Sequence, residues 1–167
     1  MMAIEIVEYD PAWPSLFELE KSRIWRLVGD AVQEIHHVGS TSVAGLCAKP
    51  KIDIDAVVVS ALLPEAIECV RSLPDFTFHG DPYSDGMWTF TSGHGSYGTR
   101  LYLCGPENDT HVKRILFRDW LREHPNVAAE YAVLKRRLAA EAHGDWRFYT
   151  RGKSDFVAAI VQQASAR

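Results

Sequence analysis

The chain has 167 residues, of which 47% are hydrophobic and 24% charged, and its formal net charge is −4 at pH 7. This length and composition predict one compact domain over residues 1–167 with a substantial buried core. The acidic balance argues against a protein that binds nucleic acid through bulk positive charge, so we do not expect a nucleic-acid partner.

Cysteines, histidines and apolar runs exclude further classes of protein. The three cysteines (Cys47, Cys69 and Cys104) are far apart, which suits a reducing compartment and provides no disulfide framework. The seven histidines show no HxxxH or HxH spacing, which argues against a zinc centre. No segment reaches the ~18–20 apolar residues that span a bilayer, and the amino terminus lacks a signal-peptide core. We therefore expect a soluble, cytoplasmic protein without a membrane partner.

The amino-terminal part of the chain predicts a short strand and a long helix. Residues 3–7 alternate weakly between polar and apolar side chains and predict an edge strand. Apolar residues then recur at helical spacing over residues 13–32, with Ser15 placed as the N-cap and Glu18 three residues later.

The remaining elements change from mostly strands to helices along the chain. Alternating and β-branched segments predict strands at 32–38, 51–60, 76–79, 87–91 and 99–104. Helical periodicity predicts helices at 64–73, 111–123, 125–143 and 146–164, the last with a break near Gly152. This order indicates an α/β (α+β) fold, in which a mixed sheet is flanked by helices and the last third of the chain is helical.

The most informative segment carries two aspartates on one expected strand. Alternation along that strand sends the side chains of Asp53 and Asp55 to one face and those of Ile52 and Ile54 to the other. Two neighbouring carboxylates repel each other, and stability alone gives no reason to place them together. A divalent cation such as Mg²⁺, which prefers oxygen ligands, removes that repulsion.

A turn of sequence Gly39-Ser40-Thr41-Ser42 precedes this strand. Its backbone N–H groups and hydroxyls suit the oxygens of a bound phosphate. The alternative is a capped turn without a ligand, because Gly and Ser commonly begin helices. Together with the paired aspartates, the turn indicates nucleotide chemistry.

A Gly-Ser pair followed fourteen residues later by Asp-x-Asp resembles the signature of the DNA polymerase beta nucleotidyltransferase superfamily. The resemblance is closer to one branch, the GrpB-like proteins, and covers nearly the whole chain. The segments that carry it are YDPAW (9–13), HVGSTSVAGL (37–46), AKPKIDIDAVV (48–58), FRDWLREHP (117–125), EYAVLKRRLA (130–139) and YTRGKSDFV (149–157).

This resemblance implies a minimal nucleotidyltransferase-like fold and a Mg²⁺-dependent reaction. A nucleoside triphosphate, expected to be ATP, would be the donor, and a small molecule would be the acceptor. Gly39 would let the backbone approach the triphosphate, and Ser40 with the N–H groups that follow it would bind its phosphates. Thr41 and Ser42 belong to the same site and are expected to shape the turn rather than to bind the phosphates directly. Asp53 and Asp55 would be the catalytic pair that holds Mg²⁺ against the phosphate oxygens.

Further candidate nucleotide ligands are suggested by charge near the aspartates or by position in the family segments: Lys49, Lys51, Arg100, Lys135, Tyr149 and Lys153. Tyr149 and Lys153 are four residues apart on a helix and share one face. A solvated surface is the alternative for these lysines. Arg118 and Asp119 are expected to form an ion pair between helices.

The match lacks one feature of the active superfamily members, a third carboxylate on a later strand. The corresponding segment, 99–103, contains none and carries Arg100. Either Glu107 or Asp109 reaches in from the end of that strand, or the substrate reacts without a base, or no transfer occurs. Two functions therefore stay open: nucleotidyl transfer to, or activation of, a small acceptor, and a non-catalytic nucleotide-binding or partner module.

Overall fold

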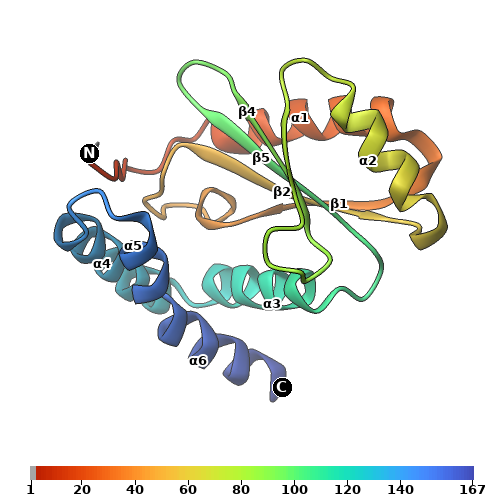
Figure 1. Ribbon diagram of the computed structural model, residues 1–167. Helices are drawn as coiled ribbons and strands as arrows, with labels where there is room; N and C mark the ends of the chain where they lie inside the picture. The colour runs from red at the N-terminus through yellow and green to blue at the C-terminus, as the bar shows by residue number, and fades with distance from the viewer. Residues whose placement is uncertain (1–2) are drawn as a thin grey trace.

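A five-stranded mixed sheet forms the centre of the molecule (Figure 1). The computed structural model describes residues 3–167. In spatial order the strands are β1 (Val32–Val38), β2 (Lys51–Val58), β5 (Gly98–Cys104), β4 (Trp88–Gly93) and β3 (Thr77–Gly80). β2 and β5 are parallel, and the other neighbouring pairs are antiparallel. The expected mixed α/β fold is confirmed.

Helices cover both faces of this sheet (Figure 1). They are α1 (Trp13–Val28), α2 (Leu63–Arg71), α3 (Asp109–Glu123), α4 (Pro125–Glu141), α5 (Trp146–Gly152) and α6 (Ser154–Ser165), with 3₁₀ turns at Gly29–Ala31, Ser40–Ser42 and Ser60–Leu62. α1 and α2 lie on one face, whereas α3 lies on the other with α4, α5 and α6 beside it (Figure 1). None of the helices within residues 3–167 combines the length and apolarity needed to cross a membrane.

Strand β2 separates an apolar face from a polar one. Ile52, Ile54, Ala56 and Val58 are fully buried in the core cluster that also contains residues of α1 and α2. Because side chains alternate along a strand, Asp53 and Asp55 point to the opposite face, toward α3. The strand therefore buries its apolar side for stability and presents its acidic side to the helices that follow.

The expected elements agree with the observed ones to within a few residues, apart from two at the amino terminus. Residues 3–7 do not form a strand; Val7 alone makes an isolated bridge, to Ala48. Ser15 is not the N-cap of the first helix, because the helix begins at Trp13 and already includes Ser15. Ala12 is the N-cap and makes no side-chain capping hydrogen bond, while the carboxylate of Asp10 accepts a hydrogen bond from the backbone N–H of Ala12 at 2.8 Å.

The last two helices meet near Gly152, as the sequence predicted. Glycine is required here because α5 lies directly on α4. A Cβ atom at position 152 would overlap the buried side chain of Leu138. The close approach brings Tyr149 and Lys153, on either side of Gly152, against α4.

The variant Gly152→Ala tests this close packing. Alanine favours a helix over glycine by about 0.5–1 kcal/mol, but the overlap with Leu138 should outweigh that gain, since overpacking a core costs about 1–3 kcal/mol. We expect a lower free energy of unfolding in urea. Gly152→Ala should lower the free energy of unfolding less in a Leu138→Ala protein than in the unmodified one, because the overlapping methyl groups are then absent. An equal loss in both proteins would contradict the explanation.

Candidate functional site

Asp55 is held by two side chains of α3. It is fully buried; its Oδ1 accepts a hydrogen bond from Arg114 Nη1 at 2.8 Å, and its Oδ2 lies 2.9 Å from His111 Nδ1. The Arg114 guanidinium also lies 4.0 Å from the centre of the Tyr102 ring. Both oxygens of Asp55 are therefore engaged, and the repulsion between paired carboxylates that the sequence suggested is offset by protein side chains.

Asp53 has a different environment from Asp55. Its Oδ1 is buried and has no hydrogen-bond partner among residues 3–167. Burial raises the pKa of this carboxyl group, while the positive charges of Arg100 and Arg114 act in the opposite direction. Gly39, with φ of +73°, passes so close that a Cβ atom there would overlap the Asp53 carboxylate. Glycine thus meets both the left-handed backbone and the close approach that this turn requires.

Side-chain hydrogen bonds hold the turn in place. Thr41 Oγ1 donates to the Lys51 carbonyl at 3.1 Å and lies 2.9 Å from His37 Nε2, while Ser42 Oγ donates to the Gly39 carbonyl. Burial is the main cause that lowers the pKa of His37 to about 4, so this ring is neutral at pH 7. These contacts give Thr41 and Ser42 a structural role in shaping the turn.

A cavity of about 150 Å³ opens beside this turn. Ten of the twelve site residues expected from the sequence line it: Gly39, Ser40, Thr41, Lys49, Lys51, Asp53, Arg100, Lys135, Tyr149 and Lys153. Ala48 and Tyr131 complete the wall. Ser42 instead lines a larger neighbouring groove, and Asp55 lies beneath Arg114. We call this space the cationic cavity, since five cationic side chains and one carboxylate surround it.

Burial changes the lysines of the cationic cavity. It is the main cause that lowers the pKa of Lys135 to about 7 and the pKa values of Lys49 and Lys153 to about 8, with smaller contributions from neighbouring cations. Aromatic rings partly replace lost water: Lys153 Nζ lies 4.3 Å from the centre of the Tyr149 ring, and Lys49 Nζ lies 4.4 Å from that of Trp146. Lys135 also donates to the Cys47 carbonyl.

Asp53 also borders a second cavity of about 190 Å³. The two spaces share Gly39, Ser40, Asp53 and Tyr131. The wall of the second cavity is mainly apolar and aromatic, with Arg114 and Arg118 as its cationic members. Neither Glu107 nor Asp109 lines either space; Glu107 is exposed, and Asp109 is paired with Lys113 at 2.7 Å on the surface.

Comparison with known proteins places the chain in a family. Residues 3–163 match the family model described as GrpB protein. The chain belongs to the GrpB family. It is 34% identical over 175 residues to a UPF0157 protein of Halalkalibacterium halodurans, with 98% of this chain and 84% of that protein covered.

Further members of the GrpB family show the same likeness. The chain is 32% identical over 161 residues to the UPF0157 protein YqkA of Bacillus subtilis, with 96% of this chain covered. It spans 47% of YqkA, about half the length of that relative. The crystal structure of conserved protein GrpB from Enterococcus faecalis superposes with a TM-score of 0.85 at 26% identity, and 96% of each chain is covered.

Sequence reasoning missed the arginines of α3 that support the site. Arg118 Nη1 donates to the His37 carbonyl at 3.0 Å, and Arg122 donates to the Ser42 carbonyl at 2.8 and 2.9 Å. The expected pairing of Arg118 with Asp119 occurs at 2.8 Å, but within α3 and not between helices. The four-residue spacing of Arg114, Arg118 and Arg122 was a signal that this helix presents a cationic face.

The variant Asp55→Asn tests whether Asp55 compensates the cations of α3. Removing one partner of a buried ion pair costs about 3–5 kcal/mol, so we expect a large drop in the free energy of unfolding, measured in urea. The control variant Asp109→Asn breaks the exposed ion pair of Asp109 with Lys113 on α3. It should change the free energy of unfolding by less than about 1 kcal/mol. If the Asp55→Asn protein is as stable as the unmodified one, the contacts with α3 do not stabilise the fold. Repulsion between the carboxylates of Asp53 and Asp55 would then be the dominant effect.

Proposed function

We propose that the cationic cavity binds the phosphates of a nucleoside triphosphate, with ATP as the expected ligand. The observation that supports this most is the gathering of Lys49, Lys51, Arg100, Lys135 and Lys153 around a small space beside the Gly39 turn. Buried cations with lowered pKa values lack compensating anions, and a polyphosphate supplies them. Lys135 is buried and Lys49 and Lys153 are half-buried, which a surface built for solvation alone would not require.

The site fits a Mg²⁺ ion held by one carboxylate better than one held by two. Mg²⁺ in nucleotide sites is commonly bound by one or two carboxylates together with substrate phosphates and water. Asp53 offers a buried oxygen without a partner among the described residues, whereas both oxygens of Asp55 are bonded to α3. When bound, Mg²⁺ would offset negative charge on the phosphate oxygens.

The protein side chains then have separate tasks around the ligand. Gly39 allows the backbone to approach the phosphates, and Ser40 contributes its hydroxyl at the cavity wall. Lys135 and Lys153 provide positive charge from the helical side, and Arg100 provides it from β5. Tyr149 orients Lys153 through the contact of its ring with the ammonium group.

Nucleotidyl transfer to a small-molecule acceptor is the second candidate function. It is favoured by the second cavity, which adjoins Asp53 and could hold an acceptor next to the phosphates. Against it stands β5, where Arg100 and Tyr102 lie opposite Asp53 and Asp55 in place of a third carboxylate. Release of pyrophosphate from Mg²⁺ and each nucleoside triphosphate, measured with a panel of small acceptors, separates transfer from binding alone.

The variant Lys153→Ala tests phosphate binding. Loss of a charge-assisted hydrogen bond should weaken triphosphate binding by about 1–3 kcal/mol in calorimetric titration, and monophosphate binding should suffer less. Lys113→Ala removes an exposed lysine of α3 that lies outside the cavity and serves as the control. Equal affinities in both variants and the unmodified protein would contradict the proposed role.

The pH dependence of binding provides a separate test. Lys135, with a pKa of about 7, and Lys49 and Lys153, with pKa values of about 8, lose their protons as the pH rises from 7 to 9. We therefore expect triphosphate affinity to fall steadily over this range. Lysines with an unperturbed pKa of about 10.4 would stay charged, so a constant affinity between pH 7 and 9 would contradict binding in this cavity.

A further inference from the structure

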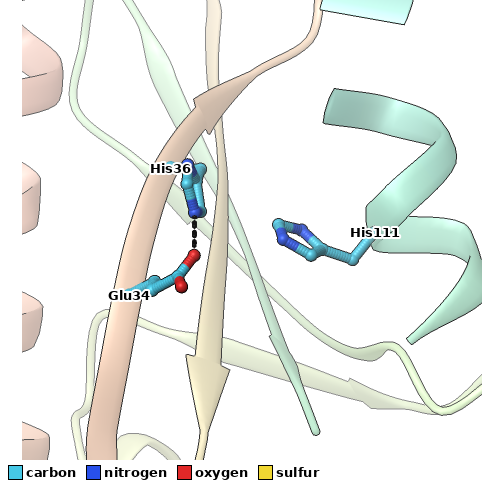
Figure 2. Close-up of side chains that lie close together, drawn as sticks. All are labelled: Glu34, His36 and His111. Atoms are coloured by element: carbon cyan, nitrogen blue, oxygen red, sulfur yellow. Dashed lines mark hydrogen bonds and ion pairs between the residues drawn. The ribbon is translucent and has the colours of Figure 1, made fainter. Parts of the chain in front are cut away.

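A second cluster of ligand-type side chains lies beyond Asp55, outside the cationic cavity. Figure 2 shows Glu34 and His36 on β1 facing His111 on α3. One ligand atom from each of these three side chains lies within 4.8 Å of the others. The spacing of histidines along the chain gave no sign of this cluster, because His36 and His111 come from elements far apart in sequence.

Regular secondary structure explains why these three side chains meet. Glu34 and His36 are two residues apart on the edge strand β1, so both project from the same face of the sheet. The pairing of β1 with β2 places His36 opposite Asp55. Asn108 caps α3: its side chain accepts a hydrogen bond from the backbone N–H of His111 at 3.0 Å. This bond fixes the first turn of the helix, which carries His111 toward His36 and Asp55.

Asp55 prepares His111 for a metal ion. Its fully buried carboxylate lies 2.9 Å from His111 Nδ1, so this nitrogen acts as the donor and Nε2 keeps its lone pair. Metal-binding histidines usually donate their second ring N–H to a carboxylate in this way, which orients the ring and raises its basicity. Because Arg114 holds the other oxygen of Asp55, the carboxylate itself is fixed.

The donor set and its exposure select the class of ion. Two imidazoles and one carboxylate suit Zn²⁺ and other divalent transition metals, whereas Mg²⁺ and Ca²⁺ prefer oxygen alone. His111 is buried, while the side chains of His36 and Glu34 are 28% and 61% exposed. Solvent thus reaches one side of the cluster, which leaves room for a water or substrate as a further ligand.

We propose that Glu34, His36 and His111 bind one divalent transition-metal ion, with Zn²⁺ as the ion tested, and that Asp55 is the positioning residue behind His111. Two donors on a tetrahedral Zn²⁺ are about 3.3 Å apart, given bond lengths of about 2.0–2.1 Å. The partly exposed side chains of Glu34 and His36, now 2.6 Å apart at Oε2 and Nε2, can turn toward His111 to reach that geometry. This site shares no residue with the cationic cavity, so neither proposal depends on the other.

Calorimetric titration of the untagged, chelator-treated protein with zinc chloride tests the site. We expect one equivalent of Zn²⁺ per chain. His36→Gln and Glu34→Gln should each weaken binding by about tenfold or more, a loss that removal of an outer partner alone can cause. His79→Gln, which replaces a histidine that contacts Thr91 on the distant strand β4, should bind as the unmodified protein does.

Cobalt provides a second measurement that does not depend on affinity. Co²⁺ bound to the unmodified protein should show visible absorption bands of a tetrahedral or five-coordinate ion, and His36→Gln should lose them while its circular dichroism stays unchanged. Absence of binding, several weak equivalents, or an equal loss in His79→Gln would each overturn the proposal.

Discussion

The buried carboxylate of Asp55 fixes helix α3 against the polar face of the sheet. It binds His111 and Arg114, which lie in successive positions along the face of α3 that looks toward β2. The same face then brings Arg118 to the carbonyl of His37, near the end of β1, and Arg122 to the carbonyl of Ser42 in the glycine turn. A helix placed differently would leave Asp55 buried without a partner, which costs several kcal/mol. Strand pairing places Val38 opposite Asp53 and so brings the turn beside it, and the contacts of α3 with Asp55 and with Ser42 support that arrangement from the helical side.

The lysines of the cationic cavity reduce the stability of the folded chain at neutral pH. Unfolded lysines keep their protons up to about pH 10.4, whereas burial lowers the pKa values of Lys49, Lys135 and Lys153 to between about 7 and 8. Between these limits the unfolded chain binds more protons, so this group of residues favours folding more at pH 9 than at pH 7. A cavity lined by apolar residues would avoid this cost. Groups of this kind collect at binding sites, where a ligand offsets the cost.

Local patterns were sufficient to predict most of the fold. The alternation in 51–60 and the helical spacing after residue 108 depend on neighbouring residues, and the strands and helices there agree closely with the structure. Residues 3–7 were assigned wrongly because a weak alternation carries no information about a pairing partner, and Val7 finds only Ala48. The first helix begins at Trp13 and already includes Ser15, and its Pro14 suits the first turn because that position needs no backbone N–H donor.

Lys135, Tyr149 and Lys153 were suggested by the family resemblance, whereas strand alternation indicated Asp53, and charge near the aspartates indicated Lys49 and Lys51. Segments around Lys49, Lys135 and Lys153 are far apart in sequence, and periodicity alone cannot bring three elements to one space. What sequence reasoning could not supply was the role of α3, because a helix with several arginines is usually a solvated one. The ion pair of Asp55 with Arg114 and the contact of Asp55 with His111 depend on the tertiary placement of that helix.

The charge on either side of Asp55 explains why the two proposed sites should prefer opposite ions. Toward the glycine turn, one carboxylate, Asp53, is outnumbered by lysines and by Arg100, and this excess of positive charge suits the proposed anionic ligand. Toward the edge strand β1, Glu34 and two histidines offer lone pairs and negative charge, so that region attracts a cation. Asp55 contacts His111 on the side of β1, and on the side of the glycine turn Arg114 neutralises its charge. Asp55 lies between the proposed anion site and the proposed cation site, and each of its oxygens contacts a different side chain of α3, Arg114 or His111.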